Sequence, residues 1–104
     1  MPETYTTGEW YAKPGEEEAF MDAWREFAAW GATKPGAGTL HLTRDLAEPS
    51  RFVSFGGWRS VEQAHAWKAD PEFPERMRRV QQHVAAFHPH ELVEVRTAGH
   101  VSTG

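Results

Sequence analysis

The period of the hydrophobic positions changes several times along the chain, and each period predicts one element. Residues 5–12 are rich in the strand-favouring residues Tyr, Thr and Trp and end at the break Lys13-Pro14-Gly15. The acidic run Glu16-Glu17-Glu18 then opens a helix, because negative charge is favoured in a helix's first turn. Its inward positions recur at helical spacing up to an end at Gly31, and they are Phe20, Trp24 and Phe27.

Two strands joined by a hairpin are predicted next. Residues 39–43 alternate, with Leu40 and Leu42 on one face and His41 on the other. Turn residues at 45–49 lead into a strand over 51–58. Its two faces carry, respectively, Val53 with Phe55, and Phe52 with Ser54 and Trp58. Since both faces are apolar, the face turned away from the helices is expected to meet something else.

A second helical region follows. Ser60 and Gln63 have the spacing of a capping box and start a short helix. The predicted buried stripe of this helix has Trp67 near its edge and consists of Val61, Ala64, His65 and Lys68. Asp70-Pro71 ends or kinks it. A second amphipathic stripe, Phe73, Met77, Val80, Val84 and Phe87, predicts a helix up to the break at His88-Pro89-His90. A last strand is predicted over 92–95.

The predicted order is βαββαβ, with the second helical region split in two. This order indicates an α+β, ferredoxin-like fold, in which helices cover one face of a four-stranded antiparallel sheet. The sequence predicts a single domain over residues 1–104, with a core at about 5–96 and a polar tail at 97–104. The free sheet face is the predicted homodimer surface.

Composition excludes several classes of partner. The formal net charge is −4, which argues against nucleic acid, since phosphate binding needs a clustered basic face. No apolar stretch approaches the length of a membrane span, and the first residues lack a secretory signal. There is no cysteine, so we expect a cytoplasmic protein. The histidines at 83, 88 and 90 lack a sequence-local carboxylate to complete a metal set, so no metal is expected.

The motifs at the helix starts carry a family resemblance. Lys13-Pro14-Gly15 opens the first helix, and Trp58-x-Ser60 is followed by Ala64, Trp67 and Phe73. On these residues the chain resembles the antibiotic biosynthesis monooxygenase (ABM) domain family over roughly residues 5–96. The resemblance implies a dimeric α+β barrel, formed by sheet-to-sheet pairing, with a ligand pocket between sheet and helices in each protomer. It also implies one of two activities: cofactor-free oxygenation of electron-rich aromatics such as anthrones, or oxidative haem degradation.

The haem alternative is disfavoured at two positions. The resemblance to haem degraders includes Trp67, which falls where their ring-distorting Trp sits. However, Met77 stands where the axial His is expected, and Gly8 or Glu9 where an Asn is expected. The prediction is therefore a monooxygenase that uses O2, without a cofactor, on a small electron-rich aromatic substrate. The alternative is a non-catalytic binding or structural member of the same fold.

Two histidines are candidates for the base that such chemistry needs. His65 is the first candidate, because an imidazole titrates near neutral pH; a surface His without a role is the competing interpretation. His41 becomes the better base if the faces of its strand are reversed, and is otherwise an interface His. The expected substrate-binding residues, which could equally be plain core, are Trp67, Trp24, Phe27, Trp58, Phe73 and Met77.

Overall fold

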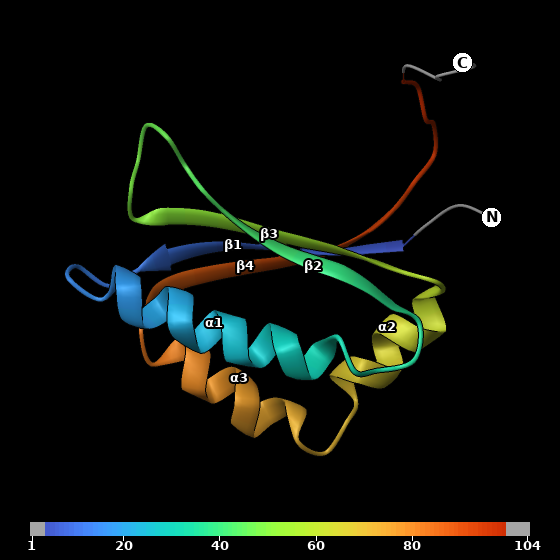
Figure 1. Ribbon diagram of the computed structural model, residues 1–104, viewed down its shortest axis with the longest axis horizontal. Helices are drawn as coiled ribbons and strands as arrows, with labels where there is room; N and C mark the ends of the chain where they lie inside the picture. Colours follow the sequence, from blue (N-terminus) through green and yellow to red (C-terminus); the bar gives the residue numbers. More distant parts are fainter. Residues whose placement is uncertain (1–3, 100–104) are drawn as a thin grey trace.

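The computed structural model of the protein describes residues 4–99 and shows helices packed on one face of a four-stranded antiparallel sheet (Figure 1). The strands are β1 (Thr4–Ala12), β2 (Ala37–Arg44), β3 (Arg51–Trp58) and β4 (Val84–Val93), and the helices are α1 (Glu17–Gly31), α2 (Val61–Lys68) and α3 (Phe73–Gln81). The strand order is β2-β3-β1-β4, which confirms the predicted ferredoxin-like fold. Of the predicted tail at 97–104, residues 100–104 lie outside the described part. None of the helices in that part is long and apolar enough to cross a membrane.

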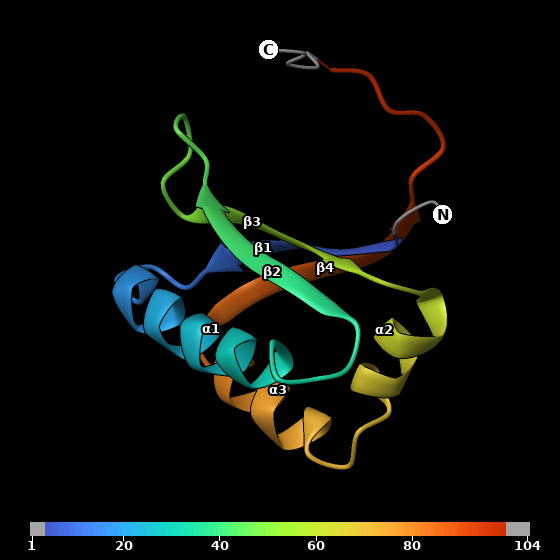
Figure 2. The same cartoon turned by 45° about the vertical axis from the view of Figure 1, so that its right-hand side comes forward.

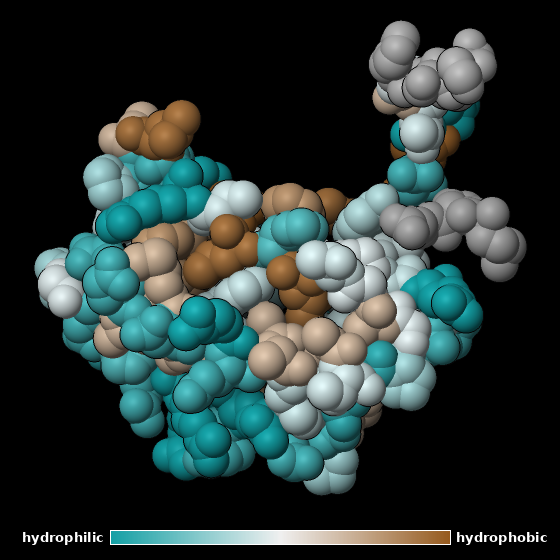
Figure 3. Space-filling view, viewed as in Figure 1, coloured by the Kyte–Doolittle hydropathy of each residue, from teal (hydrophilic) through white to brown (hydrophobic). Residues whose placement is uncertain are grey.

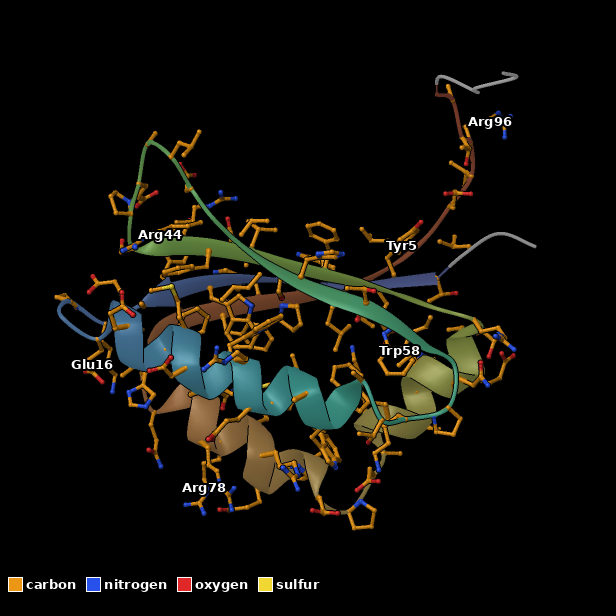
Figure 4. All side chains as sticks on the ribbon, viewed as in Figure 1. Tyr5, Glu16, Arg44, Trp58, Arg78 and Arg96 are labelled. Atoms are coloured by element: carbon orange, nitrogen blue, oxygen red, sulfur yellow. The ribbon has the colours of Figure 1, made fainter. Side chains whose placement is uncertain are left out.

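The sheet separates an inner face, against the helices, from an outer face. Along β1 buried and half-buried residues alternate strictly, so every second side chain points inward. In β3 the inward residues include Phe52 and Trp58, each 1% exposed, whereas Phe55 on the outer face is 41% exposed. Both faces of this strand are therefore apolar, as its sequence predicts. Figure 4 shows the two directions: Tyr5 rises above the sheet, and Trp58 lies below it beside α2.

The core lies between the inner face and the helices. Phe20 of α1 is fully buried, with its ring centroid 5.4 Å from that of Trp10 and 4.9 Å from that of Phe52. Val80 of α3 is equally buried. The ring contacts of Phe20 join α1 to β1 and β3. The rest of the core is also largely aromatic, and such large rings remove much apolar surface from water.

The predicted buried stripe of α2 is wrong in part. Ser60 caps the helix as predicted, since its hydroxyl accepts a hydrogen bond from the Gln63 N–H at 3.2 Å. However, the side chains that α2 buries are Ala64 and Trp67, while His65 is exposed and Val61 is 40% exposed. A helix of this length can bury little more than one pair at i and i+3. The large indole of Trp67 gains more from burial than the imidazole of His65.

The predicted end of α3 is also wrong, because the helix ends at Gln81 and residues from Val84 onward form β4. β4 is paired with β1, so its backbone groups are satisfied by the sheet. A register shift opposite Tyr11 and Ala12 places Val84 against Ala12 and Phe87 against Trp10, both inward positions. The three-residue spacing that suggested a helix is thus the spacing of a bulged strand. β4 is an edge strand, where Pro89 is tolerated.

The outer face lies in a saddle between two raised segments. The loop between β2 and β3 rises at one end, and the segment after β4 rises at the other (Figures 1 and 2). Leu46 in that loop is fully exposed, and Figure 3 shows hydrophobic residues at the raised tip. None of the helices in residues 4–99 covers this face (Figure 1).

Candidate functional site

A cavity of about 290 Å³ lies between the inner sheet face and the helices. This volume is at the lower end of the range for small-molecule sites, roughly 300–1,000 Å³. Figure 3 shows hydrophobic residues along the line where the sheet meets α1. Residues from the sheet and all three helices line the cavity: Thr6, Thr7, Gly8, Trp10, Trp24, Phe27, Ala28, Leu40, Ser54, Phe55, Gly56, Trp67, Lys68, Phe73, Met77, Gln81, Phe87 and Pro89.

Glycines at inward positions of the two central strands leave room for side chains that form the walls of this cavity. A Cβ atom on Gly8 would lie 2.8 Å from Trp10 Nε1 and 2.9 Å from a ring carbon of Phe87. A Cβ on Gly56 would lie 2.0 Å from Leu40 Cδ2. Side chains at these positions would therefore displace the residues that form the walls. The glycines thus allow the side chains of Trp10, Phe87 and Leu40 to lie directly on the backbone of the sheet.

Trp67 forms one wall and is held by other aromatic rings. Its ring stacks on Trp58, with centroids 5.0 Å apart and planes at 26°. Phe73 meets it edge-on at 5.1 Å, and Phe27 lies at 5.6 Å. Contacts on several sides fix the orientation of the indole. Such a rigid, apolar wall suits a planar ligand.

The indole N–H groups distinguish Trp67 from its neighbours. Trp10 donates to Ser54 Oγ at 2.9 Å and Trp58 donates to Thr6 Oγ1 at 3.0 Å. Trp67 Nε1 is the one buried side-chain polar atom within residues 4–99 that has no hydrogen-bond partner. A buried donor without a partner is costly and calls for an explanation. Nε1 has almost no accessible surface and lies against Gly31 of α1, where an added Cβ would be 3.2 Å away, so the close packing of Trp67 on α1 explains why the N–H has no acceptor.

Charged groups meet at the boundary between the cavity and solvent. Lys68 lines the cavity, keeps 31% of its side chain exposed, and places Nζ 3.0 Å from Glu91 Oε2. The other carboxylate oxygen, Oε1, lies 3.0 Å from His65 Nε2. Hydrogen bonding from His65, followed by that from Lys68, lowers the pKa of Glu91 below its ordinary value. Glu91 therefore stays ionised at neutral pH and joins the two groups.

The structure brings most of the predicted substrate-binding residues together. Trp67, Trp24, Phe27, Phe73 and Met77 all line the cavity. Trp58 does not line it and instead lies behind Trp67. The cavity is also lined by residues that are not among the predicted substrate-binding residues, including Gly8, Ser54, Lys68 and Phe87. The strict alternation along β1 and β3 was the signal that could have placed Gly8 and Ser54 on the inner face.

Neither predicted base lines the cavity. His65 lies outside it, with 57% of its side chain exposed, and is connected to it through Glu91 and Lys68. His41 projects from the outer face, where its ring stacks on Phe55 with centroids 4.9 Å apart. The leucines of β2 are half-buried on the inner side, so the strand faces are not reversed.

The remaining histidines lie apart from one another. His83 Nδ1 lies 2.9 Å from Glu16 Oε1. His88 and His90 alternate with the inward residues Phe87 and Pro89 of β4, so both belong to the outer face. Within residues 4–99, no three His, Asp or Glu side chains are grouped so that they could hold a metal ion.

Comparison with known proteins identifies relatives by sequence and by structure. The sequence model of the family described as antibiotic biosynthesis monooxygenase matches residues 5–79. No curated protein matches the chain significantly. Among solved structures, the chain is similar to SnoaB, a cofactor-independent oxygenase from Streptomyces nogalater. The two share 16% identity and a TM-score of 0.84, and the similarity covers 93% of this chain and 97% of SnoaB.

Two further solved structures are candidate antibiotic biosynthesis monooxygenases. The one from Chloroflexus aurantiacus has 23% identity and a TM-score of 0.75, covering 93% of this chain and 97% of the other. The one from Nitrosomonas europaea has 20% identity and a TM-score of 0.75, covering 88% of each chain. At these identities the structural likeness establishes the fold, and the family match is carried by the sequence model.

Proposed function

Because the chain belongs to the antibiotic biosynthesis monooxygenase family, we propose that it is a cofactor-independent monooxygenase that acts with O2 on a small, electron-rich aromatic substrate. The observation that carries the proposal is the cavity itself, whose walls are aromatic and include the ring of Trp67, held in place by Trp58 and Phe73. The structurally similar SnoaB is a cofactor-independent oxygenase, which supports the same class of reaction here. Anthrones and hydroquinones are the substrate class that we propose.

The proposed reaction balances without a reductant or cofactor. An anthrone-type CH2 group and O2 give a carbonyl group and one water. One oxygen atom enters the product, and the other leaves as water with the two hydrogens. The step requires loss of a proton, which makes the ring electron-rich, and then attack of the resulting anion on O2. The cavity contributes by excluding water and by orienting the ring against its aromatic walls.

His65 is the base in this proposal. Its Nε2 shares Glu91 with Lys68, which lines the cavity, so it is connected to the boundary between cavity and solvent. A substrate hydroxyl that reaches this boundary could pass its proton to His65, directly or through one water. His41 belongs to the outer face and is the rival base. It could reach a substrate only in an assembly that brings two outer faces together.

We further propose that the protein is a homodimer that pairs through the outer sheet face. Phe55 and Leu92 keep 41% and 51% of their surface exposed there. The raised segments at both ends of the sheet form a saddle that a second copy would fill (Figure 2). Burial of these side chains would contribute to the stability of the pair.

The test of the activity is oxygen uptake by the purified, cofactor-free protein with a panel of anthrones and hydroquinones. We expect enzyme-dependent uptake, and a loss of at least about tenfold in His65→Ala, within the range for general-base removal. His41→Ala tests the rival base. His83→Ala is the matched control and should retain the activity, because His83 also pairs with a glutamate but does not line the cavity. No uptake above background across the panel would contradict the oxygenase proposal, and full activity of His65→Ala would contradict the assignment of the base.

One observation favours a second candidate function, a binding protein of the same fold. No His, Asp or Glu is among the described residues that line the cavity. Tight, stoichiometric binding of panel compounds without oxygen uptake would favour this function. The haem alternative also lacks support, because none of these lining residues is the His that it requires. Titration with haem, followed by its Soret band, tests that alternative directly.

A further inference from the structure

We propose that Lys68 recognises an anionic oxygen of the ligand, so that the substrate is an aromatic compound that carries a phenolate, enolate or carboxylate group at its solvent-side edge. The inference rests on the proposed function only in that the cavity holds an aromatic ring. Lys68 is the one charged residue among the described residues of the lining. Its partial exposure places it where a polar group of a bound ring would emerge.

The ammonium group of Lys68 has unused donor capacity. A lysine carries three N–H donors, and Nζ makes one hydrogen bond within residues 4–99, to Glu91 Oε2. Two donors therefore remain for a ligand. A hydrogen bond from a charged donor to a charged acceptor is about twice as strong as one between neutral groups. An anionic ligand thus gains more at this position than a neutral one of the same shape.

Glu91 positions Lys68 and is at the same time in contact with His65. Its carboxylate lies between Lys68 on one oxygen and His65 on the other, at 3.0 Å each. These three residues come from α2 and β4, and the contacts fix the ammonium at the junction of the two elements. The carboxylate of Glu91 is thus shared between two donors and is not reserved for Lys68. An anionic group of a ligand could therefore accept a hydrogen bond from one of the remaining Lys68 N–H donors.

The same contact would assist the proposed chemistry. A cation beside a phenol or enol favours the ionised form and lowers its pKa. The ionised ring is the electron-rich species that reacts with O2. Lys68 would therefore select the substrate and also raise the fraction that is ready to react, while the proton leaves to another group.

The test compares two probes of the same shape and different charge, 2-naphthoate and 2-naphthamide, by isothermal titration calorimetry at neutral pH. We expect the wild-type protein to bind the naphthoate about tenfold more tightly, as one charge-assisted hydrogen bond allows. Lys68→Met should remove this preference and leave the affinity for the naphthamide within about twofold. Lys34→Met is the matched control, because Lys34 also forms a lysine–carboxylate ion pair, with Asp70 at 2.7 Å, and does not line the cavity.

Equal affinity of the wild type for both probes would overturn the role of Lys68 while leaving the aromatic site intact. A preference for the naphthoate that persists in Lys68→Met would also overturn it. Failure of the wild type to bind either probe would overturn the inference together with the proposed aromatic cavity. If Lys68→Met does not fold, the salt dependence of binding to the wild type replaces this variant as the test. Raising the ionic strength should weaken binding of the naphthoate and leave binding of the naphthamide unchanged. Identical salt dependence of the two probes would overturn the proposal.

Discussion

At the scale of single residues, the most informative contrast is between two stacked tryptophans. Trp58 and Trp67 lie 5.0 Å apart between ring centroids and are both buried. The N–H of Trp58 is bonded to Thr6, whereas that of Trp67 has no partner among the described residues. The fold therefore uses the indole of Trp58 as a structural donor, whereas the ring of Trp67 serves as a wall of the cavity. Of these two neighbours, Trp58 contributes mainly to stability, and Trp67 contributes to the proposed site.

This contrast predicts that the same substitution destabilises the protein by different amounts at the two positions. Trp58→Phe should lower the free energy of unfolding more than Trp67→Phe does, by about 1 kcal/mol, because only Trp58→Phe removes a hydrogen bond and leaves Thr6 without its donor. Both variants lose a similar ring volume, so each is the packing control of the other. Urea denaturation measures the difference. Equal destabilisation of the two variants would contradict the interpretation of the unpaired N–H.

Activity should follow the reverse order. Trp67→Phe replaces the indole wall of the cavity by a smaller ring, which would hold the substrate less precisely. We therefore expect a loss in kcat of about 10²-fold, as for a misplacement of about 1 Å elsewhere. Trp58→Phe should retain much more activity, because Trp58 does not line the cavity. Oxygen uptake at saturating substrate distinguishes the two variants.

At the scale of elements, α2 carries both the buried wall Trp67 and the boundary residue Lys68. The helix is short and depends on its cap at Ser60, whose hydroxyl accepts the Gln63 N–H and donates to Gln63 Oε1. Ser60→Ala should lower the free energy of unfolding by about 1 kcal/mol. Ser60→Asp keeps a capping oxygen and should restore most of the loss. Thermal denaturation of both variants measures this, and an unchanged Ser60→Ala would show that packing alone holds the helix.

The linker between α2 and α3 predicts a pH dependence. Asp70 lies 2.7 Å from Lys34 and accepts the Glu72 N–H at 2.8 Å. The hydrogen bond from Lys34, then that from Glu72, lowers the pKa of Asp70. A carboxyl whose pKa is lower in the folded state contributes stability above its unfolded pKa and loses it as the pH falls through the folded value. The linker should therefore loosen in acid.

Asp70→Asn tests this pH dependence. The variant should be less stable than the wild type at pH 6, and the difference in the free energy of unfolding should shrink as the pH falls below about 4, near the ordinary pKa of an aspartate. Denaturant titrations at a series of pH values give this difference. Glu62→Gln is a suitable control, because Glu62 is an exposed carboxyl of α2. A difference that stays constant with pH would show that the ion pair does not contribute.

Most of the elements could be predicted from the hydrophobic period, and the errors have physical causes. The strand over 51–58 was predicted with its observed bounds and faces, because alternation over eight residues fits a strand and does not fit a helix. The i, i+3 spacing of Val84 and Phe87 fits a helix as well as a bulged strand, and pairing with β1 decides between them. For His65, a helix as short as α2 carries too few positions to define a stripe.

The candidate site could be predicted only in its aromatic part. The rings of Trp24, Phe27 and Phe73 signal burial through their size. In contrast, the placement of the cavity's other wall residues depends on Gly8 and Gly56, whose lack of a side chain gives no hydrophobic signal. The contact between Lys68 and Glu91 joins residues that are far apart in the sequence. It depends on the register of β4, whose first residues, 84–87, the sequence pattern assigned to a helix.

At the scale of the whole molecule, the two faces of the sheet have different tasks. The inner face supplies the core and the cavity, and the outer face has no helix to cover it (Figure 1). Across its middle runs a row of paired outward residues from all four strands: His41, Phe55, Thr7 and His90. The exposed Phe55 lies within this row, beside the ring of His41. An apolar side chain in this position suits the centre of an interface.

This arrangement predicts the mass of the protein in solution. Multi-angle light scattering at micromolar concentration should give twice the 11.8 kDa of one chain. Phe55→Lys should give a single chain's mass, because pairing would bury a charge without a partner. Val61→Lys is the matched control: Val61 is 40% exposed, as against 41% for Phe55, but it lies on α2 and should leave the dimer intact. A monomeric wild type would contradict pairing through the outer face. A dimer that survives Phe55→Lys and dissociates in Val61→Lys would move the interface to the helical side, and His41 would then have no route to a substrate in a neighbouring chain.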